Sequence, residues 1–239
     1  MQNKVNYHLK FNDILKSVEG KLPTLLLHSC CAPCSSYVLS VLIKHFDITV
    51  FYYNPNITDE QEYLKRVEEQ KKFIDLINSG ETEFQPATKI KFIDAGFNKS
   101  EWESVISGLE QEKEGGARCY PCYNLRLQKT CKLALQNNFE YFGTTLSVSP
   151  YKNSNWLNQI GEALQTQYGV KYLYADFKKN NGYKLSIEYS YKYNLYRQNY
   201  CGCVYSKRNW LTQFLFCYIK LIIFTNHFTI IYKQKHQIK

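Results

Sequence analysis

The sequence of 239 residues lacks several features that would place it in common classes of protein. Its start, MQNKVNYHLKFNDILKSVEG, is polar and mixed in charge, without the apolar stretch of a secretory signal. No G-x-G-x-x-G follows an apparent strand, so we expect no nicotinamide or flavin site of the usual type. A composition of 44% hydrophobic and 21% charged residues excludes a disordered chain. We therefore expect a globular, cytoplasmic protein with a substantial core.

Acidic residues are absent from the last 51 residues of the chain. The last one is Glu188, and the segment from residue 189 onward carries eight lysines and arginines. The chain has 30 basic and 21 acidic residues, so the first 188 residues hold 22 and 21 and are almost neutral. A positive field of this kind suits a nucleic acid or an anionic membrane surface. A solvated basic tail is the alternative interpretation.

Apolar segments alternate with helical ones along most of the chain. The clearest helix is residues 58–80, with Thr58 as its expected N-cap and Gly80 at its end. This alternation predicts an α/β fold, a parallel sheet joined by crossover helices. The expected strands lie within residues 24–28, 47–57, 88–97, 140–150 and 170–177.

Nine cysteines without a secretory signal indicate metal binding or redox catalysis, because the cytosol keeps thiols reduced. Three of them, Cys30, Cys31 and Cys34, follow the first expected strand in HSCCAPCS. Ligands of doubly wound α/β folds bind beyond the carboxyl ends of the strands, so this position fits an active site. Adjacent cysteines can serve one site only if the backbone turns there, as it does where a strand leads into a helix.

A second group of thiols lies in RCYPCYNLRL, where Cys119 and Cys122 form a C-x-x-C at the entrance to a helix. Three residues along a turn or helix bring the second sulfur back to the same side, within reach of one metal. Two such motifs, together with an adjacent thiol, favour a metal site formed from both groups. Thiolates suit structural zinc and an iron–sulfur cluster equally well, so the spacing leaves both open.

The third thiol motif is QNYCGCVYS, which contains Cys201 and Cys203. Gly202 makes the backbone pliant enough for a strained disulfide, which is a redox-active type of bond. Metal ligation by both thiols is the alternative. Of the remaining two cysteines, Cys131 shares a helical face with apolar residues and is expected in the core, and Cys217 receives no role.

Four motifs in this order, HSCCAPCS, RCYPCYNLRL, FGTTLSVSPYKN and YCGCVYS, resemble the cobalamin-independent epoxyqueuosine reductases, the QueH family. The resemblance spans residues 22–206. It implies a Rossmann-like sheet related to nucleotide alpha-hydrolase (HUP-like) folds, with helices on both faces. It also implies an oxidoreductase that reduces epoxyqueuosine in tRNA to queuosine, the last step of queuosine biosynthesis.

The resemblance also implies roles for individual cysteines. Cys201 and Cys203 would form a redox-active pair, and Cys34 is a candidate ligand of a second metal, an additional mononuclear iron. Partners would be tRNA carrying epoxyqueuosine and an external electron donor. The expected ligands of a [4Fe-4S] cluster are Cys30, Cys31, Cys119 and Cys122.

The substrate side is less defined by the sequence. Seven tyrosines between residues 183 and 205 alternate with basic residues, a pattern that suits stacking on unpaired bases. Packing of about half of these rings on the sheet is the alternative. Hydroxyl groups after the fourth expected strand are further candidates for binding the modified base; they are Thr144, Thr145, Ser147 and Ser149.

The chain departs from the family pattern after residue 206. We expect a single α/β metalloenzyme domain over residues 1–206 and an apolar, basic extension over residues 207–239. Residues 210–232 are long enough to span a membrane, but Lys220 near their centre costs about 2.5–3.5 kcal/mol on insertion. A non-essential extension is therefore favoured over a membrane anchor or a helix packed on the body. The competing function is a zinc-stabilised, non-catalytic nucleic-acid-binding protein, although seven candidate thiols exceed the four ligands of a closed zinc site.

Overall fold

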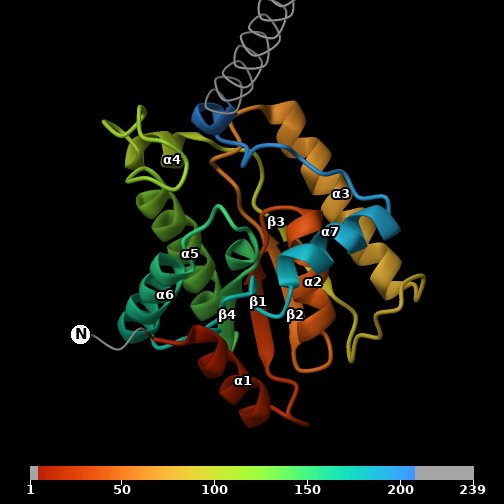
Figure 1. Cartoon of the computed structure of the whole chain (residues 1–239). Coiled ribbons are helices and arrows are strands. Elements are labelled where there is room, and N and C mark those ends of the chain that lie inside the picture. Colours follow the sequence, from red (N-terminus) through yellow and green to blue (C-terminus); the bar gives the residue numbers. More distant parts are fainter. Residues whose placement is uncertain (1–4, 208–239) are drawn as a thin grey trace, which may run out of the picture.

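Five parallel strands form the centre of the computed structural model, which describes residues 5–207 (Figure 1). Their order across the sheet is β3-β2-β1-β4-β5, and all four neighbouring pairs are parallel. The strands are β1 (Thr24–His28), β2 (Asp47–Tyr52), β3 (Lys91–Asp94), β4 (Tyr141–Thr144) and β5 (Lys171–Tyr172).

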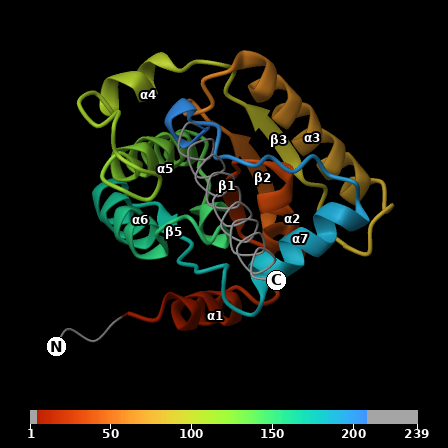
Figure 2. The same cartoon turned by 45° about the horizontal axis from the view of Figure 1, so that its top comes forward.

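Helices cover both faces of this sheet. Figures 1 and 2 show α2, α3 and α7 on one side and α5 and α6 on the other. The helices are α1 (Tyr7–Ser17), α2 (Ala32–Leu42), α3 (Glu60–Asn78), α4 (Ser100–Val105), α5 (Cys119–Gln136), α6 (Ser154–Tyr168) and α7 (Gly182–Lys192), and η1 (Leu146–Val148) is a short 3-10 turn.

Side-chain alternation along β1 divides the core into two layers. Leu25 and Leu27 pack among residues of α2 and α3, whereas Leu26 packs among residues of α5 and α6. All three leucines are fully buried. A strand with both faces covered must be apolar throughout, which is why TLLLH shows no polar alternation.

The α/β prediction with helices on both faces is confirmed, including all five strands. The chain runs outward from β1 to β2 and β3, and then returns to place β4 on the other side of β1. This change of direction makes the β1–β4 boundary the switch point, where such folds form a crevice beyond the carboxyl ends. Cys30 lies two residues beyond the end of β1, so the first thiol motif lies at that boundary.

The start of α3 differs from the expectation. Asp59, not Thr58, is the N-cap, and its side chain accepts a hydrogen bond from the amide of Glu62 at 3.0 Å. The amide of Thr58 instead donates to the carbonyl of Gly202 at 3.3 Å. Thr58 therefore precedes the helix and contacts the segment that carries Cys201 and Cys203.

Within residues 5–207 no helix is both long and apolar enough to cross a membrane. Residues 208–239 lie outside the described part of the chain, and with them the predictions made for the C-terminal extension and for Cys217.

Candidate metal and redox site

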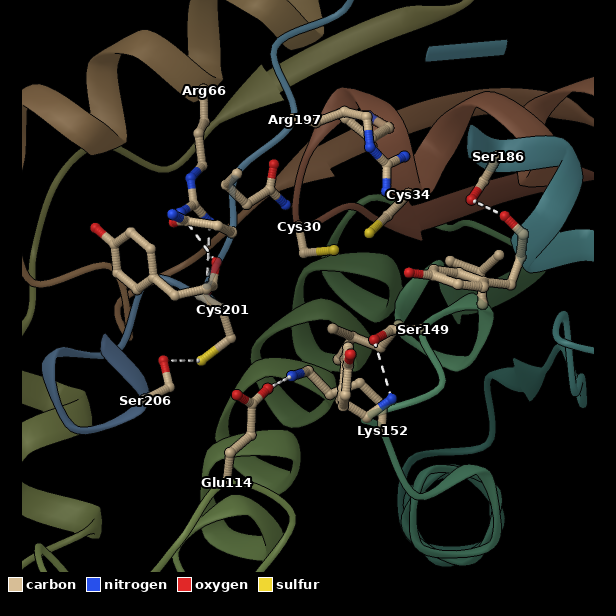
Figure 3. A pocket seen from close by; sticks show the side chains of 18 of the residues that line it. Cys30, Cys34, Arg66, Glu114, Ser149, Lys152, Ser186, Arg197, Cys201 and Ser206 are labelled. Atoms are coloured by element: carbon tan, nitrogen blue, oxygen red, sulfur yellow. Dashed lines mark hydrogen bonds and ion pairs between the residues drawn. The ribbon is translucent and has the colours of Figure 1, made fainter. Parts of the chain in front are cut away.

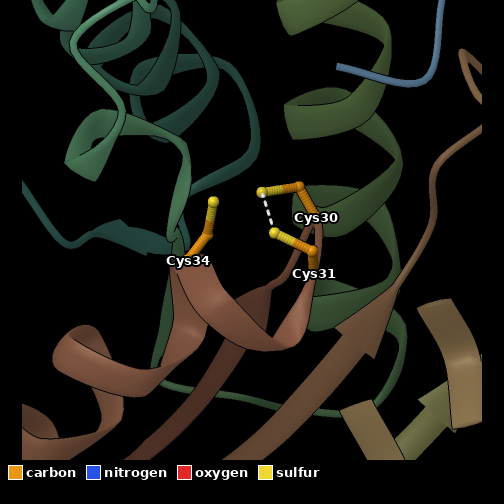
Figure 4. Close-up of side chains that lie close together, drawn as sticks. All are labelled: Cys30, Cys31 and Cys34. Atoms are coloured by element: carbon orange, nitrogen blue, oxygen red, sulfur yellow. Dashed lines mark hydrogen bonds between the residues drawn. The ribbon is translucent and has the colours of Figure 1, made fainter. Parts of the chain in front are cut away.

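The first thiol motif turns from β1 into α2, as the adjacent cysteines required. Cys31 is the N-cap residue of α2 with an extended backbone, and a proline in the first turn fits a position whose amide needs no partner. The sulfurs of Cys30, Cys31 and Cys34 all lie within 4.8 Å of one another (Figure 4). The Cys30 and Cys31 sulfurs are 3.8 Å apart. Three thiols this close can share one metal ion.

The second thiol motif begins α5. Cys119 is the first residue of the helix and Cys122 lies one turn further, so both side chains are at the same end. The amide of Gly115 donates to the Cys119 sulfur at 3.2 Å. Cys119 and Cys122 are nearly buried, and together with Cys201 and Cys203 they line one small cavity.

The third motif presents its two thiols differently. Cys201 is half-buried, and its sulfur lies 3.1 Å from the Ser206 hydroxyl. Cys203 is 4% exposed and packs with Trp102, Ile106 and Cys122. Among residues 5–207 none of the eight cysteines is joined in a disulfide.

A larger cavity of about 640 Å³ joins the first and third motifs. Cys30, Cys34 and Cys201 all line it, and Figure 3 shows their sulfurs pointing into the same space. Cys201, Arg126 and Lys152 line both this cavity and the small one behind it. The thiols from around residues 30, 120 and 200 therefore gather at one end of the sheet.

Arg126 on α5 is a buried cation between the two thiol groups. It is 2% exposed, and it donates to His28 Nε2 at 3.2 Å and to the Asn54 side chain. No carboxylate pairs with it among residues 5–207. Since an isolated buried charge is costly, negative charge on the neighbouring thiols is the natural complement.

The electrostatics of the thiols follow from this arrangement. Hydrogen bonds from Cys31 and Cys34 lower the pKa of Cys30 well below its usual value, and Arg126 adds to the effect. Burial raises the pKa of Cys122, which Arg126 partly offsets. The site thus favours a thiolate at Cys30 before any metal binds.

His28 supports the site from within the core. Both ring nitrogens have partners: Nδ1 lies 2.8 Å from the Thr144 hydroxyl, and Nε2 lies 3.0 Å from the Tyr53 carbonyl and 3.2 Å from Arg126 Nε. Burial, and then the charge of Arg126, lowers the pKa of His28 to about 3. A neutral imidazole with its proton on Nδ1 can accept the Arg126 hydrogen bond at Nε2. A pKa this low means that His28 does not act as an acid at neutral pH.

Three residues near the thiols were not identified from the sequence. Gln198 donates from Nε2 to the Cys31 sulfur at 2.8 Å. Lys152 forms an ion pair with Glu114 at 2.6 Å. Gln198, Lys152 and Arg126 all occur within the quoted motifs, but their spacing carries no signal of a role, because their partners come from distant segments.

The expected substrate-binding side chains divide into two sets. Tyr189 and Tyr193 pack against Phe84, whereas Tyr183 and Tyr200 line the large cavity. Most of the candidate hydroxyl groups in the β4–α6 segment contact other residues of the protein. Thr144 contacts His28, Thr145 lies near Cys30, Ser147 accepts from the Phe177 amide, and Ser149 lines the cavity. Cys131 is fully buried between α5 and α6, as expected for a core residue.

Fold and site together define an α/β protein with a cysteine-rich centre at the carboxyl ends of its strands. A profile described as "Epoxyqueuosine reductase QueH" matches residues 25–209. The Epoxyqueuosine reductase QueH of Staphylococcus epidermidis is 41% identical over 207 residues, 85% of each chain. That of Streptococcus pyogenes is 40% identical over 86% of this chain and 79% of its own. The Epoxyqueuosine reductase QueH of Thermotoga maritima is 34% identical over 77% of this chain and 90% of its own. The chain belongs to the QueH family.

Proposed function

We propose that this protein is an epoxyqueuosine reductase, an oxidoreductase that converts epoxyqueuosine in tRNA to queuosine. Membership of the QueH family supports this assignment. The observation that carries it further is that three cysteine motifs, far apart in sequence, line two cavities that share Cys201 and Arg126. Removing an epoxide oxygen to leave an alkene takes two electrons and two protons and releases water. The gathered thiols match a reaction of that kind.

The donor set fits an iron–sulfur centre. Cys30, Cys31, Cys119 and Cys122 would hold a [4Fe-4S] cluster, which would supply electrons one at a time. Arg126 provides a buried positive charge with no carboxylate partner in the described chain, as expected next to a cluster of thiolates. Cys34, whose sulfur is grouped with those of Cys30 and Cys31, would contribute to an additional mononuclear iron.

Cys201 and Cys203 would store the electron pair that the reaction consumes. Two thiols that close to a disulfide give up two electrons and two protons, the number that deoxygenation requires. Cys201 faces the large cavity and Cys203 lies behind it in an apolar setting. An external electron donor would then reduce the disulfide. A cytoplasmic location, where thiols stay reduced, fits this cycle.

Lys152 keeps a proton at the wall of this cavity. Burial opposes its charge, but the neighbouring Cys201 and Glu114 raise the pKa of its ammonium group well above the usual value. Its Nζ therefore remains a hydrogen-bond donor at neutral pH, beside the thiol that faces the cavity. We assign it the task of orienting the epoxide oxygen through a hydrogen bond.

The large cavity suits a single modified nucleoside. Its volume of about 640 Å³ falls within the usual range for small-molecule sites. Tyr151 lies at its edge with 69% of its surface exposed, available to stack on a base. Arg197 also lines the cavity, and no carboxylate pairs with it among residues 5–207, which leaves its charge for a phosphate.

Anaerobic purification followed by an activity assay tests the proposal. The protein should be brown, contain iron and sulfide, bleach with dithionite, and convert epoxyqueuosine-containing tRNA to the queuosine form. Cys201→Ser should retain the colour and lose turnover. Colourless protein with stoichiometric zinc and no conversion would instead identify the zinc-stabilised nucleic-acid-binding protein.

A further inference from the structure

The segment that carries Cys201 and Cys203 is held through its main-chain carbonyl groups. Asn56 donates from Nδ2 to the carbonyl of Cys201 at 3.1 Å. Arg66 donates to the same carbonyl and to that of Tyr200, each at 3.3 Å. We call Asn56 and Arg66 the carbonyl clamp. Both come from the β2–α3 region, so a distant part of the chain fixes this segment.

Arg66 is itself rigidly placed. Its side chain is only 2% exposed, it pairs with Glu62 at 2.7 Å, and its guanidinium lies 5.2 Å from the ring centre of Tyr200. A planar guanidinium with several fixed donors can hold two carbonyls and one carboxylate at once, which a lysine cannot. Burying a charged side chain is costly unless such partners are present. The carbonyls of Tyr200 and Cys201 are part of what makes this burial tolerable.

Gly202 brings the segment against the clamp. Its φ is +103°, in the region that favours glycine, and the position of an added Cβ would lie 2.6 Å from Ile57 Cγ1 and 3.3 Å from Arg66 Nη1. The Thr58 amide donates to its carbonyl at 3.3 Å. The glycine between the two cysteines therefore serves close backbone approach as well as flexibility.

We propose that Arg66 and Asn56 are positioning residues for the Cys201–Cys203 pair. They touch neither sulfur and act by fixing the main chain, so that the two thiols stay adjacent and Cys201 faces the cavity. A loop that is already ordered loses less conformational freedom when it closes to a disulfide. The clamp therefore favours disulfide formation. This inference rests on the proposed redox function of the pair.

The equilibrium between the pair and dithiothreitol tests the clamp directly. Oxidised dithiothreitol takes two electrons and two protons from the thiols, and leaves the Cys201–Cys203 disulfide and reduced dithiothreitol. Anaerobically purified holoprotein is equilibrated over a range of oxidised to reduced reagent, quenched by alkylation, and analysed by peptide mass spectrometry. In Arg66→Met and Asn56→Ala the equilibrium constant for disulfide formation should fall about three- to tenfold as the loop gains freedom.

The conservative and control variants make the test specific. Arg66→Lys keeps the positive charge but has fewer hydrogen-bond donors. Its equilibrium constant for disulfide formation should therefore lie between those of the wild type and Arg66→Met. Lys72→Met changes an exposed residue of the same helix and should leave the constant unchanged. If Arg66→Met does not fold, Asn56→Ala and Arg66→Lys carry the same comparison.

Each outcome is distinguishable. Constants in Arg66→Lys and Asn56→Ala equal to that of the wild type, or higher, would overturn the clamp while leaving the proposed function intact. A wild-type pair that never oxidises across the series would instead remove the proposed redox role, and the clamp with it.

Discussion

Arg126 donates a hydrogen bond from Nε to the Nε2 of His28 at 3.2 Å, and both side chains are buried. The bond joins α5, which carries Cys119 and Cys122, to the end of β1, which leads into Cys30. The Arg126 guanidinium thus links the two elements that carry these thiols, and its positive charge lowers the pKa of both Cys30 and Cys122 relative to burial alone. It is the structural feature that most directly relates the fold to the proposed chemistry.

Replacing Arg126 by methionine should weaken iron retention. The substitution removes the positive charge beside the thiolates and leaves His28 Nε2 without its donor. Loss of such supporting partners typically lowers metal affinity about 10–100-fold. The measurement is iron and sulfide per chain during exposure to a chelator under anaerobic conditions.

Lys129→Met provides the matched control, since Lys129 lies on the same helix but is 46% exposed and pairs with Glu101 at the surface. Its iron loss should match that of the wild type. Equal retention in Arg126→Met and the wild type would show that the guanidinium does not support a metal centre.

Cys34→Ser should separate the two proposed metal sites. Cys34 is the thiol assigned to the additional iron, whereas the cluster ligands remain. Iron content should fall while acid-labile sulfide and the visible absorption of the cluster stay unchanged, and Cys119→Ser should lower all three. Parallel loss of iron and sulfide in Cys34→Ser would make Cys34 a cluster ligand instead.

Alkylation should distinguish the two thiols of the third motif. The hydrogen bond from Cys203 lowers the pKa of Cys201 well below its usual value, and Cys201 lines the large cavity. Cys203 is 4% exposed. Iodoacetamide should therefore modify Cys201 before Cys203, because the thiolate is the nucleophile and Cys201 is the more accessible of the two.

Peptide mass spectrometry over a time course measures this order of modification. Cys131, which is fully buried and whose pKa is raised by burial to about 11, serves as the internal control that reacts only after unfolding. Faster modification of Cys203 than of Cys201 would contradict the described orientation of the pair.

Tyr151→Ala should weaken tRNA binding without changing the metal centre. Stacking of one base on an aromatic ring contributes about 1–3 kcal/mol, so the KM for tRNA should rise while iron content stays constant. Tyr151→Phe should behave as the wild type. Tyr191 is 76% exposed but does not line the cavity, which makes Tyr191→Ala the control. Equal KM values for Tyr151→Ala and Tyr191→Ala would remove the stacking role.

Asp47→Asn should reduce stability in a pH-dependent manner. Partial burial tends to raise the pKa of Asp47, but hydrogen bonds from Lys91 and Thr88 outweigh it and lower the value. A depressed carboxyl pKa stabilises the fold above the unfolded-state pKa near 4, and this contribution is lost as pH falls through the folded-state value. Because the pair is partly solvated, the expected loss at pH 7 is about 0.5–1 kcal/mol.

Thermal unfolding of the two proteins at pH 7 and near pH 3 measures this difference. The gap in unfolding temperature should be present at pH 7 and should narrow at the acid end. Both proteins carry the same thiols, so changes in a metal centre with pH are common to them. A gap that widens toward acid pH would contradict the assigned sign.

The sequence by itself determined the architecture and the positions of the thiols. Continuous apolar segments such as TLLLH can be buried on both faces only inside a covered sheet, and their alternation with helices leaves few topologies. A strand followed at once by cysteines and a proline also predicts a turn into a helix, which Cys31 and α2 confirm.

Only the tertiary structure decided which side chains surround those thiols. Arg126, Arg66 and Gln198 have no local signature, because each acts on a group more than ninety residues away in the chain. The Thr58 amide likewise has its partner far along the chain, the carbonyl of Gly202. The local sequence pattern predicts strands, helices and the spacing of the thiols. Hydrogen-bond partners that are distant in sequence depend on how the segments pack against one another.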